Sequence, residues 1–253
     1  MSTSTGGRMP LIEHLREFRK RVVRSAIVIA FGSLIGWFFY NEIITVLGQP
    51  VCDLKAAQDL GSDHCGALYI NGVLGPLNLQ IKVALLTGVI LSAPIWLYQL
   101  WAFIKPGLKG TEKQMAKGIV FYVSLLFFSG ILFGYYVVAP LSVQFFGAFQ
   151  ITPEIKTDVT IASYMSTILS TVFYTGLFFL FPIVTFLLVK IGLFTPDFLI
   201  KYRKHAIVVI LILAAVITPP DVISQVIVTI PIYILFEVSI LVAKRVERNE
   251  NKA

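Results

Sequence analysis

The stretch GIVFYVSLLFFSGILFGYYVVAPL, residues 118–141, contains no charged side chain. A helix of this length crosses the hydrocarbon core of a bilayer, for which about 20 residues are needed. Over the whole chain of 253 residues, 57% are hydrophobic and 14% are charged, too little charge to cover the surface of a soluble protein of this size. The sequence therefore predicts an integral membrane protein and not a soluble enzyme.

Five more apolar blocks lie on either side of this one. Together the predicted spans cover about residues 25–47, 77–103, 118–141, 165–189, 206–219 and 222–243. We expect an all-α integral membrane protein with six transmembrane helices, built as a single domain over residues 1–253. The first block follows a basic segment and ends without a small-residue cleavage site, so we expect it to stay in the membrane.

The last two blocks are separated only by Thr218-Pro219-Pro220-Asp221, which predicts a tight helical hairpin. Ala206–Ile217, the first of the two, is an unbroken apolar run of only 12 residues, about 18 Å as a helix. A short span of this kind requires a locally thin bilayer or tilted neighbours. The alternative is four spans followed by an interfacial or re-entrant hairpin.

Basic residues alternate between the loops and predict the orientation. They gather before span one (Arg8, Arg16, Arg19, Lys20, Arg21, Arg24), between spans two and three (Lys105, Lys109, Lys113, Lys117), between spans four and five (Lys190, Lys201, Arg203, Lys204) and in the tail (Lys244, Arg245, Arg248, Lys252). Because Lys and Arg are enriched in cytoplasmic loops, both termini, residues 1–22 and 244–253, are predicted to be cytoplasmic. The formal net charge of +7 fits this bias, and no basic stretch is interleaved with stacking aromatics, so nucleic acid is not an expected partner.

Three short stretches together are specific enough to indicate a family. They are HLREFRKR at residues 14–21, SAPIWLYQLWAFI at residues 92–104 and TPPDVISQ at residues 218–225, accompanied by Pro50, Glu112 and Glu237. In this order, over about residues 10–244, they resemble TatC, the multi-spanning component of the twin-arginine protein translocase.

The resemblance implies a receptor in the cell membrane, with no catalytic site and no cofactor. TatC-like proteins bind the twin-arginine signal peptides of folded cargo at the cytoplasmic face. They work with the single-span proteins TatA and TatB, and transport is driven by the proton motive force. We also expect a homo-oligomer within a receptor complex, surrounded by membrane lipid.

The resemblance also implies where the peptide binds. Two adjacent guanidinium groups need carboxylates to pair with, and Glu17 and Glu112 match positions that the family uses for signal-peptide recognition. Phe103 matches a position near the peptide, where an apolar wall shelters the arginine pair from water. Arg19 matches the arginine of the family's amino-terminal motif, and we expect it to hold that segment against the first cytoplasmic loop.

Spacing alone favours a different interpretation of the two glutamates. Glu17 stands four residues before Arg21, and Glu112 stands three residues after Lys109, so both are placed for intrahelical ion pairs. The two interpretations make different predictions about what Glu17 contacts.

Ionisable and polar residues inside the spans form a second group of candidates. Burying an ionisable side chain in the membrane costs at least about 2.5 kcal/mol, which favours a functional role for Glu42, Lys82 and Glu237, although each lies where it could reach water. The expected partner-binding or structural positions are Pro50, Lys82, Pro94, Asp221, Gln225 and Glu237.

One position departs from the family pattern. TatC-like proteins commonly have a glutamate two residues before the proline of span four, and here that residue is Leu180. Gln225 therefore lacks its usual acidic partner, and a role for an intramembrane carboxylate is poorly supported.

The remaining local predictions concern one loop and one helix start. Cys52 and Cys65 lie in an extracytoplasmic loop, where an oxidising compartment favours a disulfide over two free thiols, and a lone neighbouring His64 predicts no metal site. Thr195 is the expected N-cap of a short basic helix that begins at Pro196.

The main alternative function is a secondary transporter or channel for a small solute. Such proteins usually show internal repeats and a polar site at the midplane, and neither is evident here. An intramembrane enzyme is a weaker alternative because no span contains a recognisable catalytic motif. The sequence therefore favours the receptor.

Overall fold

The computed structural model describes residues 11–57, 74–104, 116–148, 161–190, 194–218 and 222–250. All regular secondary structure in these residues is helical, which confirms the predicted all-α class. In chain order the elements are α1 (Leu11–Phe38), α2 (Tyr40–Ala57), α3 (Gly75–Leu91), α4 (Ala93–Ile104), α5 (Ala116–Phe133), a π-helical segment (Gly134–Val138), α6 (Ala139–Ala148), α7 (Ile161–Phe179), α8 (Phe181–Lys190), α9 (Pro196–Lys201), α10 (Arg203–Ile217) and α11 (Val222–Glu250).

Four of the described helical stretches are long and apolar enough to cross a membrane. They are Leu15–Phe38, Gly118–Ser142, Ala162–Val189 and Val222–Arg245, and the bent pair α3 and α4 makes a fifth if it counts as one span. These stretches correspond to the predicted spans one to four and six. With 15 residues, α10 is shorter than the usual span of about 20, so the sixth crossing stays a prediction.

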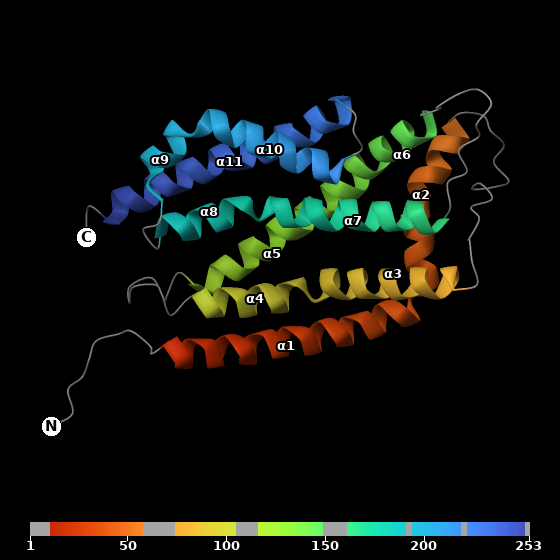
Figure 1. The fold of residues 1–253 in the computed structure, drawn as a ribbon, viewed down its shortest axis with the longest axis horizontal. Coiled ribbons are helices and arrows are strands. Elements are labelled where there is room, and N and C mark those ends of the chain that lie inside the picture. The colour runs from red at the N-terminus through yellow and green to blue at the C-terminus, as the bar shows by residue number, and fades with distance from the viewer. Residues whose placement is uncertain are drawn as a thin grey trace.

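The helices pack side by side, and α2 crosses the bundle at one end (Figure 1). The predicted first span, residues 25–47, is therefore divided, because α1 ends at Phe38 and the residues from Tyr40 onward belong to α2. The physical reason lies in the contacts of α2. Leu47 is buried in a core cluster with Met165, and the Tyr164 hydroxyl donates a hydrogen bond of 3.1 Å to the Leu47 carbonyl.

The predicted second span is also broken, with a bend of 58° between α3 and α4. Pro94 lies in the first turn of α4 and has no N–H to donate, so the ladder of helical hydrogen bonds is interrupted there. The indole of Trp96 donates from Nε1 to the Val89 carbonyl at 2.9 Å, and the Ser92 hydroxyl donates to the same carbonyl at 3.3 Å. These two side chains satisfy a backbone group that a continuous helix would have paired internally.

Small residues allow two helix pairs to approach closely. Gly32 and Gly36 of α1 lie against Ala84 and Gly88 of α3, and a Cβ added at Gly32 would stand 2.8 Å from the Gly88 carbonyl oxygen. In the same way α5 meets α7, where a Cβ added to Gly130 would stand 2.9 Å from the Gly176 Cα. Close packing of this kind stabilises helix association in a membrane, where lipid offers no hydrophobic driving force.

The carboxyl-terminal helices form the other side of the bundle. Their core is a cluster of buried apolar residues that includes Ile210, Val228, Ile232, Phe236 and Ile240. Gln225 of α11 donates from Nε2 to the Leu211 carbonyl of α10 at 3.0 Å, which ties the two arms of the hairpin together. The prediction that Thr195 caps α9 is confirmed, since its Oγ1 accepts a hydrogen bond of 3.2 Å from the Phe198 N–H.

Candidate functional site

A cavity of about 300 Å³ lies between α1 and α4. Two helix faces build it, with Phe18, Arg21, Val22, Ser25, Ala26 and Ile29 from α1 and Trp96, Gln99, Leu100 and Phe103 from α4. The α4 residues recur at intervals of three, one and three, which places them on one face of a helix. Most of the walls are apolar, and the volume is at the small end of the range for ligand sites.

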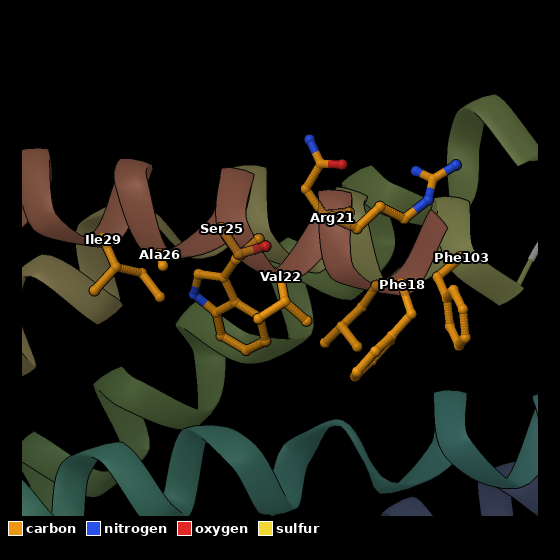
Figure 2. A pocket seen from close by; sticks show the side chains of 10 residues that line it. Phe18, Arg21, Val22, Ser25, Ala26, Ile29 and Phe103 are labelled. Carbon is orange, nitrogen blue, oxygen red and sulfur yellow. The ribbon is translucent and has the colours of Figure 1, made fainter. Parts of the chain in front are cut away.

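One end of this α1–α4 cavity is aromatic. The rings of Phe18 and Phe103 lie with their centroids 5.2 Å apart and their planes inclined by 57°. Figure 2 shows the two rings together at one end of the cavity, with Ile29 at the other. Phe103, predicted from the family resemblance, therefore reaches the cavity, and Phe18 is a neighbour that sequence reasoning missed. Phe18 lines the same cavity as Val22 and Ile29 of α1. The helical spacing of these three apolar residues was the sequence signal that could have identified Phe18.

Glu17 directly precedes Phe18 of this aromatic end in the sequence, and its carboxylate forms an ion pair with Arg21. Arg21 donates from both Nε and Nη2 to Glu17 Oε1, with an Nε–Oε1 distance of 3.2 Å. The side chains are only 19% exposed for Arg21 and 26% exposed for Glu17, so the pair is partly shielded from solvent. The intrahelical pair expected from spacing is present, and it shows that the Glu17 carboxylate can hold a guanidinium group at this place.

Gln99 supplies a hydrogen-bond acceptor that is not used. Its Oε1 is buried and has no donor among the residues that the structure describes. A buried acceptor without a partner costs about 1–3 kcal/mol, and such groups in native proteins call for an explanation. Because Gln99 lines the α1–α4 cavity, a ligand with an N–H group would satisfy it.

A second polar cluster lies on α10 and α11, away from this cavity in the sequence. Arg203 Nη2 donates to Glu237 Oε2 at 2.7 Å, and the Tyr233 hydroxyl donates to Glu237 Oε1 at 3.0 Å. Glu237, predicted as an intramembrane ionisable residue, thus has both oxygens occupied. Its partner Arg203 is 34 residues away in the sequence, and only the tertiary fold brings the two together.

The remaining predicted residues are scattered. Arg19 is exposed on α1, Lys82 is exposed on α3, and Pro94 is at the bend described above. Leu180, at the position of the family's glutamate, packs half-buried against an apolar cluster that includes Leu97 and Phe127.

Several predictions fall on residues that the structure leaves undescribed. Glu112, Asp221 and Cys65 lie outside the described ranges, and Pro50 and Cys52 are described only as backbone of α2. The proposed disulfide therefore stays a prediction. Within the described residues there is no group of three or more His, Cys, Asp or Glu side chains that could hold a metal ion.

The comparisons with known proteins all indicate the same family, and each covers most of the chain. Residues 13–231 match the family described as Sec-independent protein translocase protein (TatC). The TatC protein of Carboxydothermus hydrogenoformans is 37% identical over 246 residues, 96% of either chain. TatC of Aquifex aeolicus is 35% identical over 96% of this chain and 98% of its own, and TatCy of Bacillus subtilis is 33% identical over 97% and 92%.

A solved structure agrees with these relatives. A crystal structure described as the twin-arginine translocase receptor TatC in DDM superposes with a TM-score of 0.76 and 34% identity, covering 91% of this chain and 99% of that one. The helical membrane-spanning fold and the sequence thus lead to the same family, whose members are protein-transport components. The chain belongs to the TatC family of Sec-independent protein translocase proteins.

Proposed function

We propose that this chain is the receptor subunit of a twin-arginine translocase and binds twin-arginine signal peptides of folded proteins at the end of α1 and α4. The observation that carries the proposal is the Glu17 carboxylate, which accepts a guanidinium group beside the aromatic end of an apolar cavity. The similar solved structure, described as a twin-arginine translocase receptor, supports the same ligand.

The chemistry of the site suits such a peptide. A carboxylate pairs with the planar fork of a guanidinium more strongly than with a lysine ammonium, because two N–H groups are presented together. The Glu17 side chain is only 26% exposed, and this partial shielding from water strengthens an ion pair formed there. Glu112 is proposed as the second carboxylate, and Arg19 as a residue that holds the amino-terminal segment in place.

We propose six spans in the cytoplasmic membrane with both termini in the cytoplasm. The first half of α1 with its basic residues, α9 with Lys201 in its last turn and the basic end of α11 lie at the same end of the bundle (Figure 1), as expected if that end faces the cytoplasm. The aromatic end of the α1–α4 cavity is at this end too, since Phe18 lies in the first third of α1 and Phe103 is the last residue but one of α4.

We propose TatA and TatB as partners, a homo-oligomeric receptor complex, and transport driven by the proton motive force. The α10–α11 hairpin is the proposed docking region, because its outer face exposes apolar side chains such as Val208, Ile212, Val226 and Ile230. Lipid can also cover these residues, so crosslinking of single-span helices to them during transport is the appropriate test.

Site-directed photocrosslinking in membranes tests the receptor proposal. The probe is a signal peptide that carries either Arg-Arg or Lys-Lys, and the crosslinker replaces Phe103 in an otherwise unchanged chain. The expected result is a strong crosslink with Arg-Arg that weakens with Lys-Lys and with Glu17→Gln. Glu42→Gln, at an exposed position on α2 at the other end of the bundle, is the matched control and should leave the crosslink intact. Equal crosslinking by the two peptides, with no effect of Glu17→Gln, would remove the charge-recognition mechanism.

A further inference from the structure

In this structure a guanidinium of the chain itself already pairs with one oxygen of the Glu17 carboxylate. Arg21, one turn further along α1, directs both Nε and Nη2 at Glu17 Oε1. This is the contact that a peptide arginine would make, formed by the same chemical group. A peptide that binds Glu17 must therefore displace Arg21 or share the carboxylate with it.

We propose that Arg21 is a built-in competitor for the ligand and sets the affinity of the receptor, an inference that rests on the proposed function. In the empty state Arg21 neutralises Glu17, and only a ligand that pairs better with the carboxylate replaces it. The apparent dissociation constant then equals the intrinsic constant divided by the fraction of receptor in which Glu17 is free. Arg21 raises the apparent dissociation constant of every ligand of Glu17 by the same factor, so only ligands with high intrinsic affinity occupy the site.

The surroundings of the pair favour competition over an ordinary surface contact. Both side chains are mostly shielded, and Arg21 lines the cavity itself, so the ion pair is stronger than one in open water. By contrast, Lys20 and Arg24 on the same helix are exposed. They contribute a general positive charge, whereas Arg21 is the one among the described residues that donates hydrogen bonds to Glu17.

Displacement does not leave Arg21 without a partner. Gln99 Oε1 is a buried acceptor to which no described residue donates, and Gln99 lines the same cavity as Arg21. A side chain released from Glu17 keeps access to this acceptor and to the open side of the cavity. The exchange therefore replaces one guanidinium by another at Glu17 without burying an unpaired charge, which would cost several kcal/mol.

The test is equilibrium binding of a fluorescent Arg-Arg signal peptide to the full chain in lipid nanodiscs. Arg21→Gln should tighten binding about threefold more than Arg24→Gln does, because both remove one positive charge and only Arg21 competes for Glu17. Arg21→Lys keeps the charge but offers no fork, so a smaller gain is expected. In a Glu17→Gln background the extra gain from Arg21→Gln should disappear.

The outcomes separate this inference from the receptor proposal. If Glu17→Gln weakens binding while Arg21→Gln weakens it too, or only matches Arg24→Gln, Arg21 orients Glu17 or contacts the ligand and the competitor model is wrong. If Glu17→Gln leaves binding unchanged, Glu17 is not the ligand's carboxylate, and both proposals for this residue fail. Arg21→Lys guards against a folding artefact, because it keeps the charge and the long side chain at this position.

Discussion

Arg203 at the first position of α10 and Glu237 in the long helix α11 are joined by a hydrogen-bonded ion pair of 2.7 Å. The Tyr233 hydroxyl, one turn earlier in α11, donates a hydrogen bond to the other carboxylate oxygen of Glu237. The pair fixes the start of the short helix α10 relative to α11, at the end of the bundle where the basic segments gather (Figure 1).

Arg203→Gln should destabilise the protein by about 1 kcal/mol. The full value of a charged hydrogen bond is not expected, since the side chains are 42% exposed for Arg203 and 32% exposed for Glu237 and solvent screens them. Thermal unfolding in detergent, combined with Glu237→Gln in a double-mutant cycle, measures the coupling. Lys204→Gln, at the next and exposed position, is the matched control; a loss as large as that of Arg203→Gln would contradict a specific pair.

Gly32→Val should separate α1 from α3 and lower stability by more than about 2 kcal/mol. The added side chain has no room, because even a Cβ at this position lies 2.8 Å from the Gly88 carbonyl oxygen. Thermal unfolding and protease sensitivity of α1 in membranes are the measurements. Gly118→Ala is the control, since its Cβ would meet only the tip of the Tyr122 ring at 3.8 Å. Equal tolerance of both substitutions would mean that the two helices are not in backbone contact.

Trp96→Phe should cost about 1 kcal/mol because the Val89 carbonyl loses its indole donor at the bend between α3 and α4. The loss is limited by Ser92, whose hydroxyl donates to the same carbonyl. A Ser92→Ala, Trp96→Phe double variant should therefore lose more than the sum of the two single variants. Trp37→Phe, an exposed tryptophan on α1, is the control and should change the unfolding temperature little.

Gln99→Leu should have opposite effects on stability and on binding. The empty protein should gain about 1 kcal/mol, since a buried acceptor without a donor is replaced by an apolar side chain of similar size. Peptide affinity should fall, because the cavity loses the acceptor that is open to Arg21 once the peptide displaces it from Glu17. Unfolding temperature and peptide binding, measured on the same preparation, check both signs. Gln144→Leu, at an exposed position on α6, should change neither, and a gain of affinity in Gln99→Leu would show that the acceptor repels the ligand.

Much of the architecture could be predicted from the sequence, because hydropathy and the helical repeat are local properties. The limits of residues 118–141 and 222–243 agree closely with the span-length helices Gly118–Ser142 and Val222–Arg245. The N-cap at Thr195 was predictable for the same reason, since a cap depends on neighbours within one turn. The change of direction between Phe38 and Tyr40 could not be predicted, because hydropathy carries no information about the direction of the helix axis.

The candidate site was predictable only in part. Phe103 and Glu17 came from a family resemblance, and the pairing of Glu17 with Arg21 came from spacing on one helix. The contact of Phe18 with Phe103, like that of Arg203 with Glu237, joins residues distant in the chain. Such pairs depend on the packing of whole helices, which a single sequence does not specify. The vacant acceptor on Gln99 likewise follows only from knowing what surrounds it.

The contact of α1 with α3 through Gly32, Gly36, Ala84 and Gly88 divides the surface of α1 into two parts with different freedom to evolve. One stripe is held by backbone touching backbone and accepts no larger side chain. The opposite surface, where Phe31 and Leu34 are exposed, can exchange one apolar residue for another without moving the helix. A lineage can therefore adapt this outer surface to membranes of different thickness or lipid composition while Glu17 keeps its place.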